Sequence, residues 1–93
     1  MPVYVDAGAT AFRRMKMAHM LADTEPELHE MADRIGLKRE WFQIDGGTPH
    51  YDICQSKRKK ALELGATEIN RNEVVALIRR LRNAHNDKYI HRR

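Results

Sequence analysis

The chain has 93 residues, of which 32% are charged and 42% are apolar, and its formal net charge is +4 at pH 7. This composition indicates one small globular domain, and no apolar run approaches the roughly 20 residues needed to cross a bilayer. The start, MPVYVD, has no signal-peptide pattern, and the single cysteine, Cys54, excludes an internal disulfide, so we expect a cytoplasmic protein.

The charge is unevenly divided along the chain. Residues 1–50 carry 6 Lys/Arg and 8 Asp/Glu, a balance of −2, whereas residues 51–93 carry 11 and 5, a balance of +6. A basic half favours anionic partners such as nucleotides and nucleic acids. The core of so short a chain is thin, which is also compatible with a homodimer or a protein partner.

The first half of the chain is expected to form strands around one helix. Residues 2–6 contain VYV, a β-branched and aromatic run typical of a strand. Residues 16–22, KMAHMLA, are compatible either with a helix or with a central buried strand. Thr24, with a glutamate three residues later, predicts the start of a helix over 25–35. Residues 40–44, EWFQI, are expected to be an edge strand.

The second half is expected to form two helices separated by a strand. Asp52 is predicted to cap a helix over 53–64. Residues 67–69, TEI, lie between a glycine that ends this helix and an asparagine that caps the next, over 71–82. Residues 84–93 form a basic tail without an apolar stripe.

The order of these elements predicts the α/β class. A helix, a glycine, a short strand and a helix cap follow one another as in a parallel sheet. We therefore expect a small single domain over residues 1–83, with a short, partly parallel sheet and three amphipathic helices, followed by the tail.

One group of polar residues is expected at an edge of this sheet. Ligands of parallel α/β sheets bind outside the carboxyl ends of the strands. Asp6 ends the first strand, Asp23 ends the second, and His50 and Asp52 lie where the chain enters the second helix. These oxygens and nitrogens would suit Mg²⁺ or Mn²⁺, as in a metal-dependent phosphoesterase or nuclease.

The N-terminus of the second helix gives the leading hypothesis. Helix N-termini attract anions through unpaired N–H groups and partial positive charge. His50, Tyr51, Ser56, Lys57 and Arg58 surround this helix end, so we expect them to bind a phosphate-bearing ligand, either a nucleotide or a nucleic acid. The sequence contains no GxxxxGK, CxxC, HExxH or GxSxG motif, so no class of enzyme is indicated.

The sequence also resembles a known family. The segments VYVD, HMLADTEPELHEMADRIGL in residues 19–37, EWFQ, and HYDICQSKRKKALELGA in residues 50–66 are similar to the domain-of-unknown-function family numbered 4031, small proteins of bacteria and phages, from residue 3 to about residue 80. Members usually carry a second acidic residue where this chain has Ala7, so one carboxylate of a metal site is missing there.

The resemblance implies a bacterial or phage accessory protein without an established activity. It leaves open a third reading, a phage-encoded inhibitor or protein-interaction module that acts as a homodimer. The polar positions that it singles out are Asp6, His19, Asp23, His50, Tyr51, Asp52, Ser56 and Arg58.

Overall fold

The computed structural model describes the backbone of residues 2–7, 10–12, 15–44 and 48–90. The described strands are Val3–Val5 (β1), Thr10–Phe12 (β2), Met15–Ala22 (β3), Tyr51–Cys54 (β4) and Thr67–Glu68 (β5). The described helices are Glu25–Arg34 (α1), Gln55–Glu63 (α2) and Arg71–Ile90 (α3), with a 3-10 turn at Arg39–Trp41 (η1). No helix within these residues is long and apolar enough to span a membrane.

The sheet is mixed and is built around β3. Residues 20–22 of β3 pair antiparallel with β1, and residues 15–17 pair antiparallel with β2. β4 pairs antiparallel with residues 17–20, which overlap both of these stretches, so β4 lies along the opposite edge of β3. β1 also pairs in parallel with β5. The predicted α/β class is confirmed, as is the pairing of VYV with TE in a partly parallel sheet.

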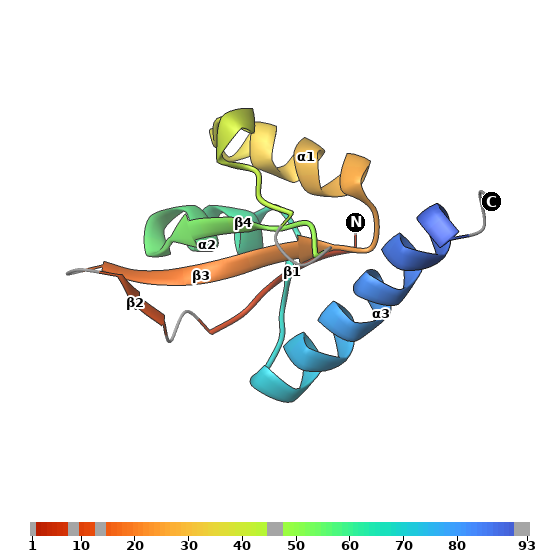
Figure 1. The fold of residues 1–93 in the computed structure, drawn as a ribbon. Coiled ribbons are helices and arrows are strands. Elements are labelled where there is room, and N and C mark those ends of the chain that lie inside the picture. The colour runs from red at the N-terminus through yellow and green to blue at the C-terminus, as the bar shows by residue number, and fades with distance from the viewer. Residues whose placement is uncertain (1, 8–9, 13–14, 45–47, 91–93) are drawn as a thin grey trace.

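Helices α1 and α2 cover one face of the sheet (Figure 1). The register places Val3 opposite Ala22 and Val5 opposite Met20, so these side chains point to the same face. They form the main core with Leu28, Met31, Ala32 and Ile35 of the α1 segment and with Ala61 of α2, among others. The apolar stripe predicted for the first helix therefore faces the sheet, as its spacing requires.

Helix α3 crosses the other face of the sheet (Figure 1). Leu21, Ile69 and Leu77 form a small buried cluster there, against which Tyr4 and Leu81 are packed, with Val74 and Ile78 alongside. Because successive residues of a strand point to opposite faces, the neighbours Tyr4 and Leu21 contact α3 whereas Val3 and Ala22 contact the main core.

Local signals fix the helix ends much as predicted. Thr24 caps α1 by accepting a hydrogen bond from the Glu27 amide at 3.4 Å, and Asn70 accepts one from the Glu73 amide at 2.9 Å. The Glu73 carboxylate in turn accepts from the Asn70 amide, which completes a capping box at the start of α3. Beyond α1, Gly36 has φ of +81°, a left-handed conformation that glycine adopts without strain.

Three predictions of local structure are resolved or corrected. Residues 16–22 are a strand, since they lie in β3 between two sheet partners. The prediction of an edge strand over 40–44 is wrong: the chain forms the turn η1, followed by an isolated bridge between Gln43 and His50. The third helix does not end near residue 82 but continues to Ile90, into the segment predicted to be a tail.

The start of the second helix also differs from the prediction. Asp52 is not a helix cap, because it lies inside β4, and α2 begins only at Gln55. The N-cap is Cys54, which makes no side-chain capping bond. The alternation of polar and apolar residues in HYDIC, typical of a half-buried strand, prevails over the local preference of Asp for caps.

Candidate functional site

Two histidines and two aspartates lie together on the face of the sheet that α3 crosses. His19 of β3 is paired across the sheet with Asp52 of β4, and His50 is two residues before Asp52, so all three side chains share one face. Asp6 follows β1 and lies beside His19 from the other edge of β3, where its amide donates to the His19 carbonyl at 3.1 Å. We call these four residues the histidine–aspartate cluster.

Asp6 holds His19 by two contacts. Its Oδ1 accepts a hydrogen bond from the His19 amide at 3.0 Å, and its Oδ2 lies 2.6 Å from the ring Nδ1. Because a carboxylate only accepts, the His19 Nδ1 carries the proton of this bond. The ring is therefore fixed, and its Nε2 is directed to the opposite side, 3.7 Å from Asp52 Oδ1.

His50 is oriented in the same sense by the backbone. Its Nδ1 lies 2.9 Å from the carbonyl oxygen of Thr48, which only accepts, so Nδ1 donates and Nε2 is left for other partners. That Nε2 lies 3.8 Å from Asp52 Oδ1. The other oxygen of Asp52 accepts from Gln43 Nε2 at 2.9 Å. Two Nε2 atoms thus converge on a single carboxylate oxygen.

A cavity of about 180 Å³ opens beside the two histidines, between the sheet and α3. It is lined by His19, Leu21, Thr48, His50, Ile78 and Arg82. Thr48 is only 5% exposed, and within the described residues its Oγ1 is the buried side-chain atom without a hydrogen-bond partner. The Arg82 side chain is exposed and makes no hydrogen bond or ion pair with the residues that the structure describes. We call this space the histidine cavity.

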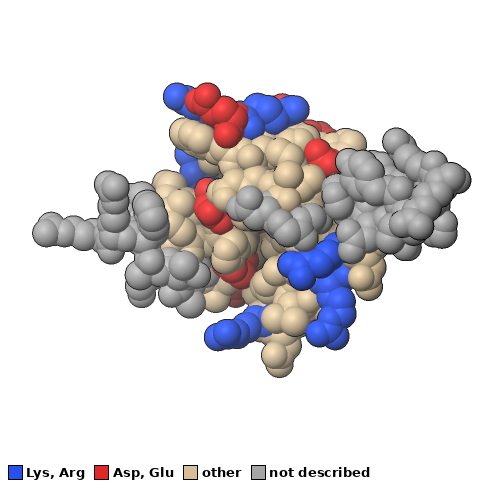
Figure 2. All heavy atoms as spheres, in the orientation of Figure 1, with Lys and Arg blue, Asp and Glu red and all other residues tan. Residues whose placement is uncertain are grey.

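Helix α3, which borders the histidine cavity through Ile78 and Arg82, carries several positive charges. α3 carries four exposed arginines, at positions Arg71, Arg79, Arg80 and Arg82. On the face seen in Figure 2, Lys and Arg side chains gather over the surface that α3 forms. An anion that approaches this face therefore meets a favourable field, which salt would screen.

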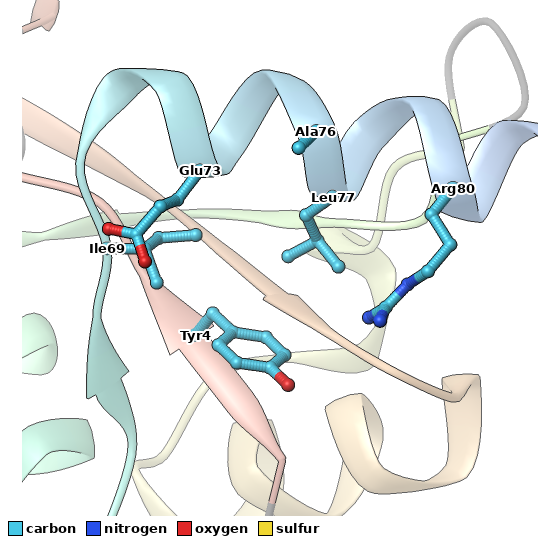
Figure 3. A pocket seen from close by; sticks show the side chains of 6 residues that line it. All are labelled: Tyr4, Ile69, Glu73, Ala76, Leu77 and Arg80. Carbon is cyan, nitrogen blue, oxygen red and sulfur yellow. The ribbon is translucent and has the colours of Figure 1, made fainter.

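A second cavity, of about 300 Å³, lies on the other flank of α3 (Figure 3). The Tyr4 ring and Leu77 form its apolar floor, and Glu73 and Arg80 stand at its rim. Both charged groups are already engaged: Glu73 accepts from the Asn70 amide, and Arg80 pairs with an aspartate at 2.5 Å. Although it is the larger cavity, it offers a ligand fewer polar partners than the histidine cavity does.

Asp23 does not join the histidine–aspartate cluster, contrary to the prediction. Asp23 follows β3, which runs antiparallel to β1, so the carboxyl ends of these two neighbouring strands point in opposite directions. Asp23 instead accepts from Arg80 at 2.5 Å and from the Tyr4 hydroxyl at 3.3 Å. Among the described residues, no group of three or more His, Cys, Asp or Glu side chains is placed to hold a metal ion.

Tyr51 does not face the same side as His50. Its side chain is fully buried in the main core, and its hydroxyl lies 2.8 Å from Nδ1 of His29 on α1. Burial, the largest influence, raises the pKa of Tyr51 above the ordinary 10.0. The prediction that Tyr51 contacts a ligand at the surface is therefore wrong: it is a core residue that anchors α1 to β4.

The predicted residues of the second helix point to different places. Ser56 is exposed, and its Oγ lies 3.2 Å from the Cys54 sulfur. Lys57 reaches the end of α1, where its Nζ lies against Gly36. Arg58 is mostly buried; its Nε donates to the Asp6 carbonyl at 2.7 Å and its Nη2 contacts Glu68. Because its partners are Glu68 of β5 and the carbonyl that follows β1, Arg58 connects α2 to these two strands.

Sequence reasoning missed two residues that line the histidine cavity, Thr48 and Arg82, and one that contacts Asp52 of the histidine–aspartate cluster, Gln43. Thr48 gave no signal, because a threonine in a turn is unremarkable by type, and Gln43 was assigned to an edge strand. Arg82 was visible only as one of several basic residues off the apolar stripe of the third helix. The alternation within HYDIC was the available signal that His50 and Asp52 share a face.

These features define a class: a small α/β protein with a mixed sheet that presents paired histidines and aspartates beside a basic helix. Within that class, the chain belongs to the family described as "Protein of unknown function (DUF4031)", which matches residues 3–81. The resemblance predicted from the sequence is thereby confirmed. No curated protein and no solved structure matches the chain significantly.

Proposed function

We propose that this protein binds a phosphate-bearing ligand, a nucleotide or a nucleic acid, in the histidine cavity. The observation that carries the proposal is a pair of donors, Thr48 Oγ1 and the Arg82 guanidinium, that line one cavity and have no partner among the described residues. An unpartnered buried hydroxyl costs about 1–3 kcal/mol, which a phosphate oxygen would recover by accepting its hydrogen bond. Arginine is the side chain best suited to phosphate.

The histidines complete the polar lining. His50 lines the cavity with a side chain only 15% exposed, and because its Nδ1 is engaged by the Thr48 carbonyl, Nε2 is the ring nitrogen left for a ligand. Either imidazole can donate to a phosphate when it is protonated. Asp52 Oδ1 lies 3.7 and 3.8 Å from the two Nε2 atoms, so its carboxylate can offset the charge of an imidazolium.

The size of the cavity favours one phosphate group of a strand over a free nucleotide. Pockets that enclose a drug-sized ligand measure about 300–1,000 Å³, and the histidine cavity measures about 180 Å³. We therefore propose a single-stranded nucleic acid, one phosphodiester of which enters the cavity while its neighbours follow the exposed arginines of α3. The site that the sequence predicts at the N-terminus of α2 is less favoured, because Arg58 donates to the Asp6 carbonyl.

The metal-dependent alternative receives less support. It requires Asp6, Asp23, His50 and Asp52 together, and Asp23 is held by Arg80 at another place. The cytoplasmic location, the bacterial or phage origin and the homodimer remain proposals that follow from the resemblance and the composition. A protein-interaction role would appear as a self-associating or partner-bound form without affinity for nucleic acid.

The experiment is fluorescence anisotropy of a labelled single-stranded oligonucleotide with two matched variants. Arg82→Gln removes a charge at the histidine cavity, and Arg34→Gln removes the same charge from α1, on the opposite face. We expect Arg82→Gln to weaken binding about tenfold and to lower the salt dependence by about one phosphate contact. Arg34→Gln should leave both unchanged. Equal effects of the two variants would show that only net charge matters and would refute the proposed site.

A further inference from the structure

We propose that the histidine cavity cleaves single-stranded RNA, with His50 as the general base and His19 as the general acid. The inference rests on the proposed function, because a strand must first place a phosphodiester in the cavity against the two rings. It adds a reaction and a substrate class to what would otherwise be a binding site.

The geometry of the two rings supports a proton-transfer pair. Each Nδ1 is occupied by an acceptor, the Asp6 carboxylate or the Thr48 carbonyl, so each Nε2 is the atom that can exchange a proton. Both Nε2 atoms lie within 3.8 Å of Asp52 Oδ1, and the ring centroids are 5.9 Å apart. Because both rings line the same cavity, one phosphodiester bound there can contact the two of them.

The two rings differ in their partners, and this difference assigns their roles. His19 donates through Nδ1 to the Asp6 carboxylate, whereas His50 donates through Nδ1 to a neutral carbonyl. Asp52 lies almost equally far from both rings, at 3.7 and 3.8 Å, so it does not distinguish them. We assign the acid to His19, because Asp6 holds that residue by two contacts and its carboxylate balances the charge of an imidazolium, and the base to His50.

RNA is the substrate that this pair of imidazoles suits best. Its ribose 2′-hydroxyl is a nucleophile that already lies next to the phosphorus, so the protein has to supply only a base and an acid. An intramolecular attack of this kind has a high effective molarity, and acid–base assistance typically adds about 10²–10⁴-fold. DNA has no 2′-hydroxyl, so it should bind to the cavity without being cleaved.

The step balances without any further reactant. His50 Nε2 takes the proton of the 2′-hydroxyl while O2′ forms a bond to phosphorus. The bond from phosphorus to O5′ breaks with its electron pair on O5′, which receives the proton of His19 Nε2. The products are a 2′,3′-cyclic phosphate and a 5′-hydroxyl end. Thr48 and Arg82 would donate to the non-bridging oxygens, on which negative charge accumulates.

The experiment compares a short labelled single-stranded RNA with DNA of the same sequence, both in EDTA. We expect the RNA to give the 2′,3′-cyclic phosphate, identified by mass spectrometry, and the DNA to bind intact. His19→Gln and His50→Gln should each lower the cleavage rate at least a hundredfold, a much larger factor than the loss of affinity for DNA in the same variants. Arg34→Gln, on the opposite face, should cleave at the wild-type rate. Circular dichroism would confirm that each variant is folded.

Asp6 provides a separate test, because it acts through His19 as a positioning residue. Asp6→Asn should lower kcat for RNA cleavage and leave KM nearly unchanged, because the His19 ring loses the carboxylate that holds it in place. A purely structural role would not produce this separation of kcat from KM.

Each other outcome has a defined meaning. If the wild-type protein binds RNA but leaves it intact, the inference is overturned and the proposed function still stands. RNA and DNA that both fail to bind would overturn the two together. Cleavage that persists in folded His19→Gln and His50→Gln proteins would also overturn the inference, since the activity would then belong to another site or to a contaminating nuclease.

Discussion

Thr48→Val is expected to stabilise the protein and at the same time to weaken its binding of nucleic acid. Valine has nearly the same shape as threonine, and Thr48 is 5% exposed, so the substitution mainly removes a hydroxyl that has no partner within the described residues. A buried hydroxyl of this kind costs about 1–3 kcal/mol. We expect a gain in the free energy of unfolding of about 1 kcal/mol, which corresponds to a rise in Tm of about 4–8 °C.

The loss of affinity follows from the same atom. A hydrogen bond to a charged phosphate contributes about 1.5–3 kcal/mol, so its removal should weaken binding about tenfold or more. Urea denaturation and anisotropy on the same preparations measure both effects. Thr24→Val is the matched control: Thr24 caps α1, so its loss should cost about 1 kcal/mol and leave binding unchanged.

The opposite signs make the prediction easy to refute. If Thr48→Val destabilises the protein by 1 kcal/mol or more, a scale typical of a lost hydrogen bond, the hydroxyl has a partner in the free protein. If it stabilises the protein but affinity is unchanged, the hydroxyl does not meet the ligand, and the histidine cavity is not where phosphate binds. Only the combination of greater stability and weaker binding supports the proposed site.

Three further outcomes follow from contacts outside the histidine cavity. Tyr51→Phe should cost about 1 kcal/mol, since it leaves His29 Nδ1 without its partner, and binding should not change. Because burial raises the pKa of Tyr51, the stability that its neutral form contributes is complete below pH 10.0 and is lost as pH rises through the raised value; alkaline denaturation of the phenylalanine variant should lack this loss. The rate at which Cys54 reacts with iodoacetamide should rise with pH and reach half its maximum below pH 9.0, because the Ser56 hydroxyl donates to the thiolate and lowers the pKa of Cys54. Ser56→Ala should raise the pH of this midpoint. Arg58→Ala should cost about 1–2 kcal/mol of stability in urea denaturation without loss of affinity, since its partners belong to the sheet edge.

The elements that could be predicted from the sequence are those fixed by near neighbours. The capping boxes at Thr24 and Asn70 and the glycine after α1 are settled within a few residues, and the structure confirms them. The strand VYV could also be predicted, because alternating β-branched and aromatic residues suit a half-buried sheet. Among the helices, the start of the second and the end of the third were misplaced.

The candidate site depended on strand direction, which near neighbours do not determine. The rule that ligands bind at the carboxyl ends of strands holds for parallel sheets, and it led to the prediction that Asp6 and Asp23 lie together. β1 and β3 are antiparallel, so Asp6 and Asp23 lie at opposite ends of this pair of strands. The same antiparallel pairing places Asp6 directly beside His19, a contact between residues 13 positions apart that no local pattern indicates.

The register of β4 is the step that assembles the histidine–aspartate cluster. Alternation within HYDIC assigns His50 and Asp52 to one face and Tyr51 to the other, whatever strand lies alongside. Pairing of Asp52 with His19 then decides that this polar face is the one shared with α3. A slip of one residue would turn His50 and Asp52 into the main core and Tyr51 toward α3, exchanging two polar groups for one aromatic ring. The burial of Tyr51 against His29 therefore fixes the register, and through the register it holds the two histidines face to face with Asp52.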